Sequence, residues 1–408
     1  MNCRHCRKPL EHVFLDLGCA PPSNAYLSEE ELSAPELYFP LKLYVCDSCW
    51  LVQTQDYARA DELFRADYAY FSSVSSSWLD HAARYCSMIA PRLALGAESL
   101  VIEIASNDGY LLRNFVAQGI PCQGIEPTAG TAAAAEAQGI PVLREFFGAN
   151  LGARLAHEGK QADLIIGNNV YAHVPDINDF TAGLKAALKP RGTITLEFPH
   201  LLTLIGNVQF DTVYHEHFSY LSLCTVACIL GAEGLRVWDV EQLPTHGGSL
   251  RVYACHAGDA RPSSANVSKV QDEERASGLQ DLEVFRQFPT RANGVKDGLL
   301  TFLVEAKRQG KSVAGYGAAA KGNTLLNYGG VKPDLLPYVC DAAPSKQGKY
   351  LPGSRIPVLS PSALFERRPD YVLILPWNIS EEVMREQSGI RAWGGRFVVA
   401  VPELIVTP

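Results

Sequence analysis

Four cysteines near the start of the chain have the spacing of a metal site. They form two pairs, Cys3-x-x-Cys6 and Cys46-x-x-Cys49. Zinc is bound tetrahedrally by four thiolates, and each CxxC turn offers two sulfurs to one ion. Four thiolates leave no open position for a catalytic water, so we expect a structural zinc ion. The alternative is two unrelated surface pairs.

A predicted strand-to-helix turn in the middle of the chain carries acidic and polar groups, and the next predicted strand ends in Glu126. The turn contains Glu103, Ala105, Asn107, Asp108 and Gly109. Doubly wound sheets bind nucleotide-like ligands at such turns, and an acid placed like Glu126 accepts both hydroxyls of a ribose. Acidic groups repel a pyrophosphate and attract a cation, which favours S-adenosylmethionine. The alternative is an ordinary turn with a solvated pair of acids.

The densest group of titratable side chains is the run Tyr214-His215-Glu216-His217-Phe218-Ser219-Tyr220. On a strand His215 and His217 would share a face, whereas a helix or turn would group them differently, and both arrangements stay open. An HxH metal site would need a third ligand. General acid–base catalysis needs one histidine with an orienting carboxylate. A histidine-rich surface loop is the other interpretation.

Three shorter stretches carry groups that could face the same cleft. Asn168, Asn169 and His173 follow a predicted buried strand, so they would lie at the carboxyl edge of the sheet. His246 precedes a Gly-Gly pair, which permits close backbone approach to a ligand or makes a turn. Tyr68 follows the cysteine-rich region and could present its hydroxyl to the cleft. Each of these signals is weak when taken alone.

The elements that must position these groups alternate between strands and helices. We expect strands at 41–45, 100–105, 122–125, 142–147, 162–166 and 192–198, and helices at 77–89, 111–118, 131–138, 151–158 and 178–188. The rhythm breaks over 205–256 and resumes with strands at 312–316, 338–340, 371–375 and 396–400. Alternating strands and helices predict parallel sheets covered on both faces. The fold class is therefore α/β, with two α/β halves behind a small metal domain.

Composition narrows the class of protein. The 408 residues are 47% hydrophobic and 20% charged, which excludes a disordered chain. The net charge of −8 offers no basic excess, so nucleic acid is not the expected partner. We see neither an apolar run of bilayer length nor a signal core at the N-terminus, so we expect no membrane association and a cytoplasmic location.

Taken in order, six motifs resemble the sugar C-methyltransferase family of deoxysugar biosynthesis. They are the paired CxxC units, the Glu-Ile-Ala-Ser-Asn-Asp-Gly turn, Asn-Asn-Val-Tyr-Ala-His, Tyr-His-Glu-His-Phe-Ser-Tyr, His-Gly-Gly-Ser-Leu-Arg, and the glycine-rich stretch that ends at Asn323. The match runs nearly end to end. The resemblance implies a zinc-binding domain over 1–75, a Rossmann-like class I methyltransferase domain over 76–257, and a second Rossmann-like domain over 258–408 that helps to bind a nucleotide sugar.

The resemblance also implies a reaction and the residues that perform it. The family methylates C3 of a nucleotide-linked 4-keto-hexose through an enolate. His217 would be the base, with Tyr214, Glu216, His173 and Tyr68 around the sugar. S-adenosylmethionine would be bound by Glu103, Ala105, Asn107, Asp108, Gly109, Glu126, Asn168 and Asn169, the substrate by His246, Tyr316, Lys321 and Asn323, and zinc by Cys3, Cys6, Cys46 and Cys49.

Two other functions stay open. Gly315-x-Gly317-x-x-Ala320, with Asp341 one strand later, fits a dinucleotide fingerprint and hence an NAD-dependent oxidoreductase. Against it stands Lys321, which suits a phosphate of a nucleotide sugar. The other possibility is a zinc-domain binding module without catalysis. We expect a nucleotide-linked keto-sugar as the partner, and a monomer or weak dimer.

Overall fold

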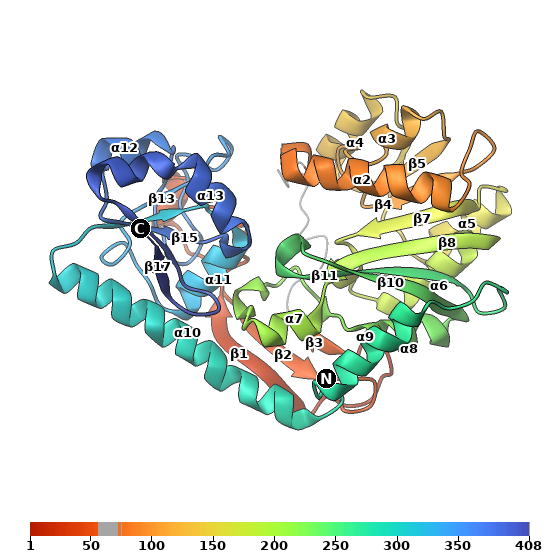
Figure 1. Ribbon diagram of the computed structural model, residues 1–408, viewed down its shortest axis with the longest axis horizontal. Coiled ribbons are helices and arrows are strands. Elements are labelled where there is room, and N and C mark those ends of the chain that lie inside the picture. Colours follow the sequence, from red (N-terminus) through yellow and green to blue (C-terminus); the bar gives the residue numbers. More distant parts are fainter. Residues whose placement is uncertain (56–71, 75, 408) are drawn as a thin grey trace.

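The computed structural model describes residues 1–55, 72–74 and 76–407. Figure 1 shows two lobes, the middle and C-terminal parts of the chain, joined below by the N-terminal strands and the long helix α10 (Leu282–Arg308). None of the described helices has the length and apolarity needed to cross a bilayer.

The N-terminal domain is built on a four-stranded antiparallel sheet in the order β1-β2-β3-β9. Its strands are β1 (His12–Ala20), β2 (Phe39–Val45), β3 (Val52–Thr54) and β9 (Ser219–Tyr220). The predicted strand at 41–45 is confirmed within β2. Strand β9 comes from the histidine-rich motif and pairs with β3, so that motif completes the sheet of the metal domain.

The middle domain contains a seven-stranded sheet in the order β10-β11-β8-β7-β4-β5-β6. Its strands are β4 (Val101–Ile104), β5 (Cys122–Ile125), β6 (Val142–Leu143), β7 (Ala162–Asn168), β8 (Leu188–Pro199), β10 (Leu235–Leu243) and β11 (Ser249–His256). The pairs from β6 to β8 are parallel, as predicted, and β11 runs antiparallel to both neighbours. The hairpin β10–β11 lies in the stretch 205–256, where the predicted alternation of strands and helices breaks.

Helices alternate with these strands along the described part of the chain. They are α2 (Ser76–Arg92), α3 (Arg113–Val116), α4 (Ala129–Glu136), α5 (Ala149–His157), α6 (Ile177–Ala187), α7 (Leu201–Gly206) and α8 (Leu223–Ala232). Every predicted helix of this region is present, although α3 is shorter than the run 111–118. Helix α6 begins where the Asp176 side chain accepts hydrogen bonds from the backbone N–H groups of Asn178 and Asp179.

The C-terminal domain repeats the α/β plan with a six-stranded sheet in the order β14-β13-β12-β15-β16-β17. The strands are β12 (Val313–Tyr316), β13 (Val339–Cys340), β14 (Val358–Leu359), β15 (Tyr371–Ile374), β16 (Arg396–Val399) and β17 (Ile405–Thr407). Its helices are α10, α11 (Ala320–Tyr328), α12 (Ser362–Arg367) and α13 (Ser380–Glu386), whereas α9 (Ala265–Ala276) packs against β10 and α8 of the middle domain. The second α/β half is thus confirmed.

The N-terminal domain shares apolar cores with both lobes. Phe14 of β1 packs against Phe288 of α10 at 4.8 Å between ring centroids, in a cluster that extends into the C-terminal sheet. The cysteine-rich end instead belongs to the cluster of the middle domain, where Cys49 and Leu51 join Val226 of α8. The N-terminal domain therefore packs against both lobes and fixes their relative position.

Candidate active site

The four N-terminal cysteine sulfurs lie within 4.8 Å of one another. Cys3 Sγ is 3.5 Å from Cys49 Sγ, and Cys6 Sγ is 3.5 Å from Cys46 Sγ. Zinc at about 2.3 Å from each of four tetrahedral thiolates separates them by about 3.8 Å, so the set fits one ion. The hydrogen bond between the two thiols lowers the pKa of Cys3 and raises that of Cys49, so Cys3 is the first of this pair to ionise.

Both CxxC pairs fold into the same turn. The backbone N–H of Arg7 donates to the Cys3 carbonyl at 3.0 Å, and that of Trp50 donates to the Cys46 carbonyl at 2.9 Å. Arg7 and Trp50 both adopt left-handed backbone angles, with φ of 63° and 60°. The four thiols therefore lie in two turns of the same conformation, residues 3–7 and 46–50, which we call the zinc knuckles.

The predicted cofactor turn coils tightly after β4. Ala105, Asn107 and Gly109 all have positive φ, at 57°, 50° and 79°. A Cβ on Gly109 would stand 2.4 Å from Ile140 Cδ1 and 3.2 Å from Ala135 Cβ. Glycine is required at this position by both the backbone angle and the space.

Glu126 fixes this turn from the neighbouring strand. Its carboxylate accepts from the backbone N–H of Asn107 at 3.0 Å and from that of Thr128 at 2.9 Å. The turn is also covered by the segment before α2, because the Ser72 and Ser73 N–H groups donate to the Asn107 amide oxygen and the Asp108 carboxylate. The structure therefore brings the predicted acids and the Asn107 side chain together.

The floor of this turn is acidic and has unused acceptors. Glu103 Oε2, Ser106 Oγ and Asp108 Oδ1 are buried and have no hydrogen-bond partner among the described residues. Burial raises the pKa of Glu103 well above its usual range, and the Asp108 and Glu126 carboxylates raise it further. A cation with N–H donors would relieve both the repulsion and the missing hydrogen bonds. The residues present fit S-adenosylmethionine.

A second set of polar groups follows β7. Asn169 has a φ of 52°, and its side-chain N–H donates to His246 Nε2 at 3.0 Å. Because Nε2 accepts, the neutral His246 ring carries its proton on Nδ1. Burial lowers the pKa of His246 to about 4, and the Lys321 charge lowers it further. The Trp78 ring lies 5.1 Å from His246 and 6.0 Å from Tyr110.

The histidine-rich motif forms a turn that gathers three rings. The His217 ring centroid lies 4.2 Å from that of Tyr214 and 4.5 Å from that of His173. His173 Nδ1 donates to the Glu216 carbonyl at 2.8 Å, which leaves Nε2 as an acceptor. Burial lowers the pKa of His217 well below its usual value and that of His173 to about 4. Both rings are therefore neutral near pH 7, as a proton acceptor must be.

The same turn separates the two histidines of the HxH run. His215 Nε2 donates to the Phe39 carbonyl of β2 at 3.2 Å, so this ring faces the N-terminal sheet. The Glu216 carboxylate accepts from the Asn24 amide at 3.1 Å to each oxygen. His215 and His217 do not share a face, and among the described residues they belong to no group that could hold a metal ion.

The C-terminal domain brings a cation to this cluster. Lys321 Nζ donates to Asn378 Oδ1 at 2.6 Å and lies 4.4 Å from the Trp377 ring centroid. Trp377 Nε1 donates to Asp211 Oδ2 at 2.7 Å. Burial lowers the pKa of Lys321 to about 8 and raises that of Asp211 to about 6. The Lys321 charge contributes to the lowered pKa of His217, so the ammonium stands near the histidines.

Sequence reasoning missed Asp211, Trp377 and Asn378. Asp211 stands just ahead of the histidine-rich run, and its place in a dense polar motif was the available signal. Trp377 and Asn378 follow β15 with no motif around them. They become visible only when the two lobes are placed together.

Two predicted residues stand apart from the cluster. The Tyr316 hydroxyl accepts from Gln387 Nε2 at 3.1 Å, and its ring belongs to an apolar cluster of the C-terminal sheet. Asn323 is 1% exposed and donates to the Ser23 carbonyl at 2.6 Å, so in this structure it joins the first and third domains. Tyr68 lies outside the described residues.

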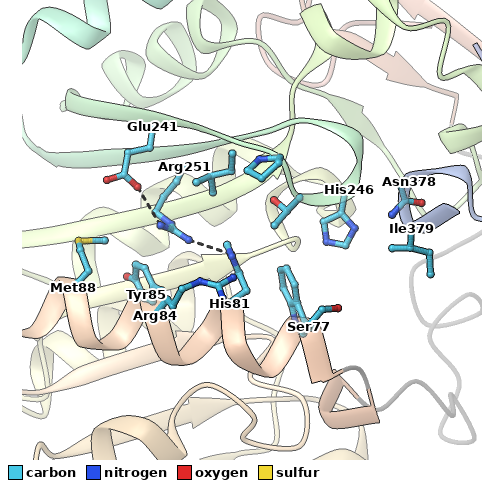
Figure 2. A pocket seen from close by; sticks show the side chains of 14 residues that line it. Ser77, His81, Arg84, Tyr85, Met88, Glu241, His246, Arg251, Asn378 and Ile379 are labelled. Atoms are coloured by element: carbon cyan, nitrogen blue, oxygen red, sulfur yellow. Dashed lines mark hydrogen bonds and ion pairs between the residues drawn. The ribbon is translucent and has the colours of Figure 1, made fainter. Parts of the chain in front are cut away.

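A cavity of about 680 Å³ opens between α2 and the β10–β11 hairpin (Figure 2). His246 and Asn378 line it, so it adjoins the histidines and the lysine. Nearby, the fully buried Glu197 carboxylate accepts from Arg251 Nη2 at 2.8 Å and from Thr245 Oγ1 at 3.0 Å. This ion pair fixes the hairpin turn that carries His246.

Known families match consecutive parts of the chain. A zinc binding domain matches residues 3–64, a methyltransferase domain matches 78–240, and the C-methyltransferase C-terminal domain matches 244–402. C-methyltransferase NovU of Streptomyces niveus is 34% identical over 402 residues, which cover 98% of this chain and 96% of NovU.

Among solved structures, the 1,6-didemethyltoxoflavin-N1-methyltransferase of Burkholderia thailandensis is 17% identical, with a TM-score of 0.38 over 50% of this chain and 94% of its own. The PH0226 protein of Pyrococcus horikoshii is 13% identical, with a TM-score of 0.38 over 47% of this chain and 99% of its own. The cysteine quartet fits zinc, and the methyltransferase domain with its acidic turn fits S-adenosylmethionine. Since the identity with NovU extends along almost the whole chain, the protein belongs to the family of sugar C-methyltransferases that its motifs resemble.

Proposed function

We propose that the protein methylates C3 of a nucleotide-linked 4-keto-(deoxy)hexose through an enolate. The observation that carries this proposal is the neutral His217 imidazole, flanked by Tyr214 and His173 and close to the Lys321 ammonium. A hydrogen beside a ketone is weakly acidic because its loss gives a delocalised enolate. A neutral imidazole within reach can remove it.

The neighbours of His217 divide the remaining work. The Tyr214 hydroxyl is the donor for the enolate oxygen, since a hydrogen bond aimed at developing charge lowers the barrier. His173 already donates from Nδ1 to the Glu216 carbonyl. Its Nε2 is therefore an acceptor that orients whichever group donates a hydrogen bond to it. Glu216, held by Asn24, and Tyr68 complete the set assigned to the sugar.

The cofactor supplies an electrophilic methyl group when bound. Glu103, Asp108 and Glu126 hold its positive charges and its ribose, with Ala105, Asn107, Gly109, Asn168 and Asn169 forming the rest of the cradle. Lys321 and His246 bind the nucleotide sugar from the other side, and Lys321 pairs with a phosphate. The cavity of about 680 Å³ beside them has the size of a small-molecule site.

The oxidoreductase alternative loses support at the C-terminal turn. The Asp341 carboxylate, which a dinucleotide ribose would need, accepts from the Ala318 N–H at 2.7 Å and from Lys346 at 3.3 Å. Tyr26 of the N-terminal domain donates to the Ala318 carbonyl at 2.5 Å. Because Glu126 accepts a similar backbone bond, the distinguishing groups are Lys346 and Tyr26, which use the Ala318 carbonyl and an Asp341 oxygen at the turn where NAD would bind. A non-catalytic module would have no need of two buried neutral histidines.

Exchange of the C3 hydrogen tests the proposal most directly. The wild type is incubated in deuterated water with a panel of nucleotide-linked 4-keto sugars, with His217→Asn and His215→Asn beside it. Loss of a general base typically costs about 10²–10⁴-fold, and we expect this loss in His217→Asn alone. Melting temperatures with and without S-adenosylmethionine check that both variants fold and bind it. If exchange persists in His217→Asn, the base lies elsewhere.

A further inference from the structure

The first zinc knuckle lies against the loop that carries His173. Arg4 Nη1 donates to the Pro175 carbonyl at 2.6 Å. His5 Nδ1 is 2.8 Å from Asn178 Oδ1, and Arg7 forms an exposed ion pair with Asp176 at 3.6 Å. Residues 4–7 thus contact Pro175, Asp176 and Asn178, which follow His173 in the chain.

Arg4 reaches the His217 segment with its other nitrogen. Arg4 Nη2 donates to the Thr54 carbonyl at the end of β3, at 3.0 Å. Thr54 in turn donates its N–H to the Phe218 carbonyl at 3.1 Å and its hydroxyl to the His217 carbonyl at 3.3 Å. The guanidinium also lies 5.3 Å from the Phe218 ring centroid. One side chain therefore contacts the two segments that carry the neighbouring imidazoles.

The position of Arg4 is itself fixed by the knuckle. The residue is 6% exposed, and its backbone N–H donates to Gln53 Oε1 at 2.8 Å. Gln53 Nε2 donates to the Cys3 sulfur at 3.3 Å. A guanidinium remains charged at every working pH and donates in two fixed directions from one plane. It can set a distance between two carbonyls, whereas an ammonium on a flexible stem cannot.

We propose that Arg4 is a positioning residue that sets the placement of His173 relative to His217. The inference rests on the proposed function for what the two rings do. Without Arg4, the Pro175 carbonyl and the buried Thr54 carbonyl lose their charged donor, and the loop 171–175 can shift against β9. Misplacement of a reacting group by about 1 Å can cost 10²-fold in rate. The cofactor turn makes no part of this arrangement, so cofactor affinity should not change.

Arg4→Gln and Arg4→Lys, made in the zinc-loaded full chain, test the proposal, with Arg7→Gln as the matched control. Arg7 occupies the same knuckle, but its ion pair is exposed on both sides. We expect kcat to fall about 10–100-fold in Arg4→Gln. Arg4→Lys should recover part of it, and Arg7→Gln should be unaffected. KM, zinc content and the dissociation constant for S-adenosylmethionine should stay at wild-type values in all three.

Histidine NMR with ¹³C-labelled imidazoles supplies a readout that does not need turnover. The His173 and His217 signals, assigned with His173→Gln and His217→Asn, should shift and titrate at higher pH in Arg4→Gln, while all other histidines except the adjacent His5 stay unchanged. Native kcat with unchanged His173 and His217 signals in folded Arg4→Gln would overturn the proposal. Loss of zinc or a general shift of all histidines would also overturn it, in favour of a purely structural role. If the wild type methylates no keto sugar but the two signals still move, the proposed function fails and the positioning role stands.

Discussion

The middle domain and the C-terminal domain share one arrangement. In each, an acid at the end of one strand accepts a hydrogen bond from the turn after the neighbouring strand. Glu126 accepts from the Asn107 N–H at 3.0 Å, and Asp341 accepts from the Ala318 N–H at 2.7 Å. In each half the second carboxylate oxygen accepts from the N–H two residues after the acid. The two turns therefore share one framework.

What surrounds the two turns is different. Beside the middle turn, Glu103 Oε2 and Asp108 Oδ1 are buried acceptors without a partner among the described residues. Beside the C-terminal turn, Lys346 donates to Asp341 and to the Ala318 carbonyl, and Tyr26 donates to that carbonyl as well. The first turn is prepared for a ligand and the second is filled by protein. A glycine-rich strand-to-helix turn therefore does not indicate a cofactor until its unused hydrogen-bonding groups are known.

Removal of zinc should have the largest effect of all, because the N-terminal domain packs against both lobes, whereas the cofactor turn is held by Glu126 of the middle domain. The N-terminal domain supplies Tyr26 and the strand that pairs with β9, and metal binding in small zinc domains is worth about 10–16 kcal/mol of folding free energy. We expect chelation, or Cys46→Ser, to lower the melting temperature and abolish methyl transfer. Affinity for S-adenosylmethionine, measured by calorimetry, should persist.

Cys19→Ser is the control for this experiment, because Cys19 is exposed and lies outside the quartet. It should behave as the wild type does. If Cys46→Ser kept its melting temperature and lost only kcat, zinc would act in the reaction rather than in folding. That result would contradict the structural assignment.

Replacing a glycine by alanine should destabilise the protein by a similar amount at either turn. Gly109→Ala strains a φ of 79° and crowds Ile140, and Gly317→Ala strains a φ of 86° and places a Cβ 2.4 Å from Pro376 Cδ. Backbone strain costs about 1–3 kcal/mol and overpacking about 1–3 kcal/mol more. Urea unfolding should show both losses, but only Gly109→Ala should also weaken cofactor binding.

Gly119→Ala is the matched control for the steric part. Its φ is 69°, and a Cβ there would meet nothing within 4 Å. It should lose only the cost of backbone strain. Equal destabilisation by Gly109→Ala and Gly119→Ala would mean that the middle turn has room for a side chain.

Much of the fold was predictable because its strands are buried on both faces. Runs rich in β-branched and aliphatic residues identified β4, β7 and β8, and the alternation with helices indicated the short strand β5 and predicted a parallel sheet. Strand β9 could not be found this way, since Ser219 and Tyr220 pair with residues of β3 far away in the chain. The predicted strand at 142–147 shortens to Val142–Leu143, where it forms the edge of the sheet.

The site was predictable as a set of residue types but not as a geometry. Tyr214, His217 and His173 were recognisable from their density and from their place after a strand. The divergence of His215 from His217 depends on whether the segment is a turn or a strand, and β9 pairing decides that. Trp377 and its bond to Asp211 arise from contact between lobes, which no local pattern records.

The paired acids give a sharper test of the comparison, with an effect of intermediate size. Glu126→Ala removes the acceptor for two ribose hydroxyls, each charge-assisted bond being worth about 1.5–3 kcal/mol. The dissociation constant for S-adenosylmethionine should therefore rise about 10²–10⁴-fold. Asp341→Ala should leave it unchanged and lower only stability, because Asp341 serves backbone N–H groups and Lys346. Weaker cofactor binding in Asp341→Ala would show that the two turns are not independent.

The smallest expected effect is a pH dependence of cofactor affinity, and it should depend on the middle domain alone. Burial and the neighbouring Asp108 and Glu126 raise the pKa of Glu103, so in the free protein this carboxyl keeps its proton to higher pH than an exposed glutamate does. A bound cation favours the ionised form, so cofactor binding should release that proton, and affinity should rise with pH by at most about tenfold per unit. Above the raised pKa the carboxyl is already ionised and the slope should vanish. Glu103→Gln should flatten the rise and Asp341→Asn should leave it intact, as calorimetry in buffers of different ionisation enthalpy would report. The same slope in Glu103→Gln would mean that the proton comes from another group.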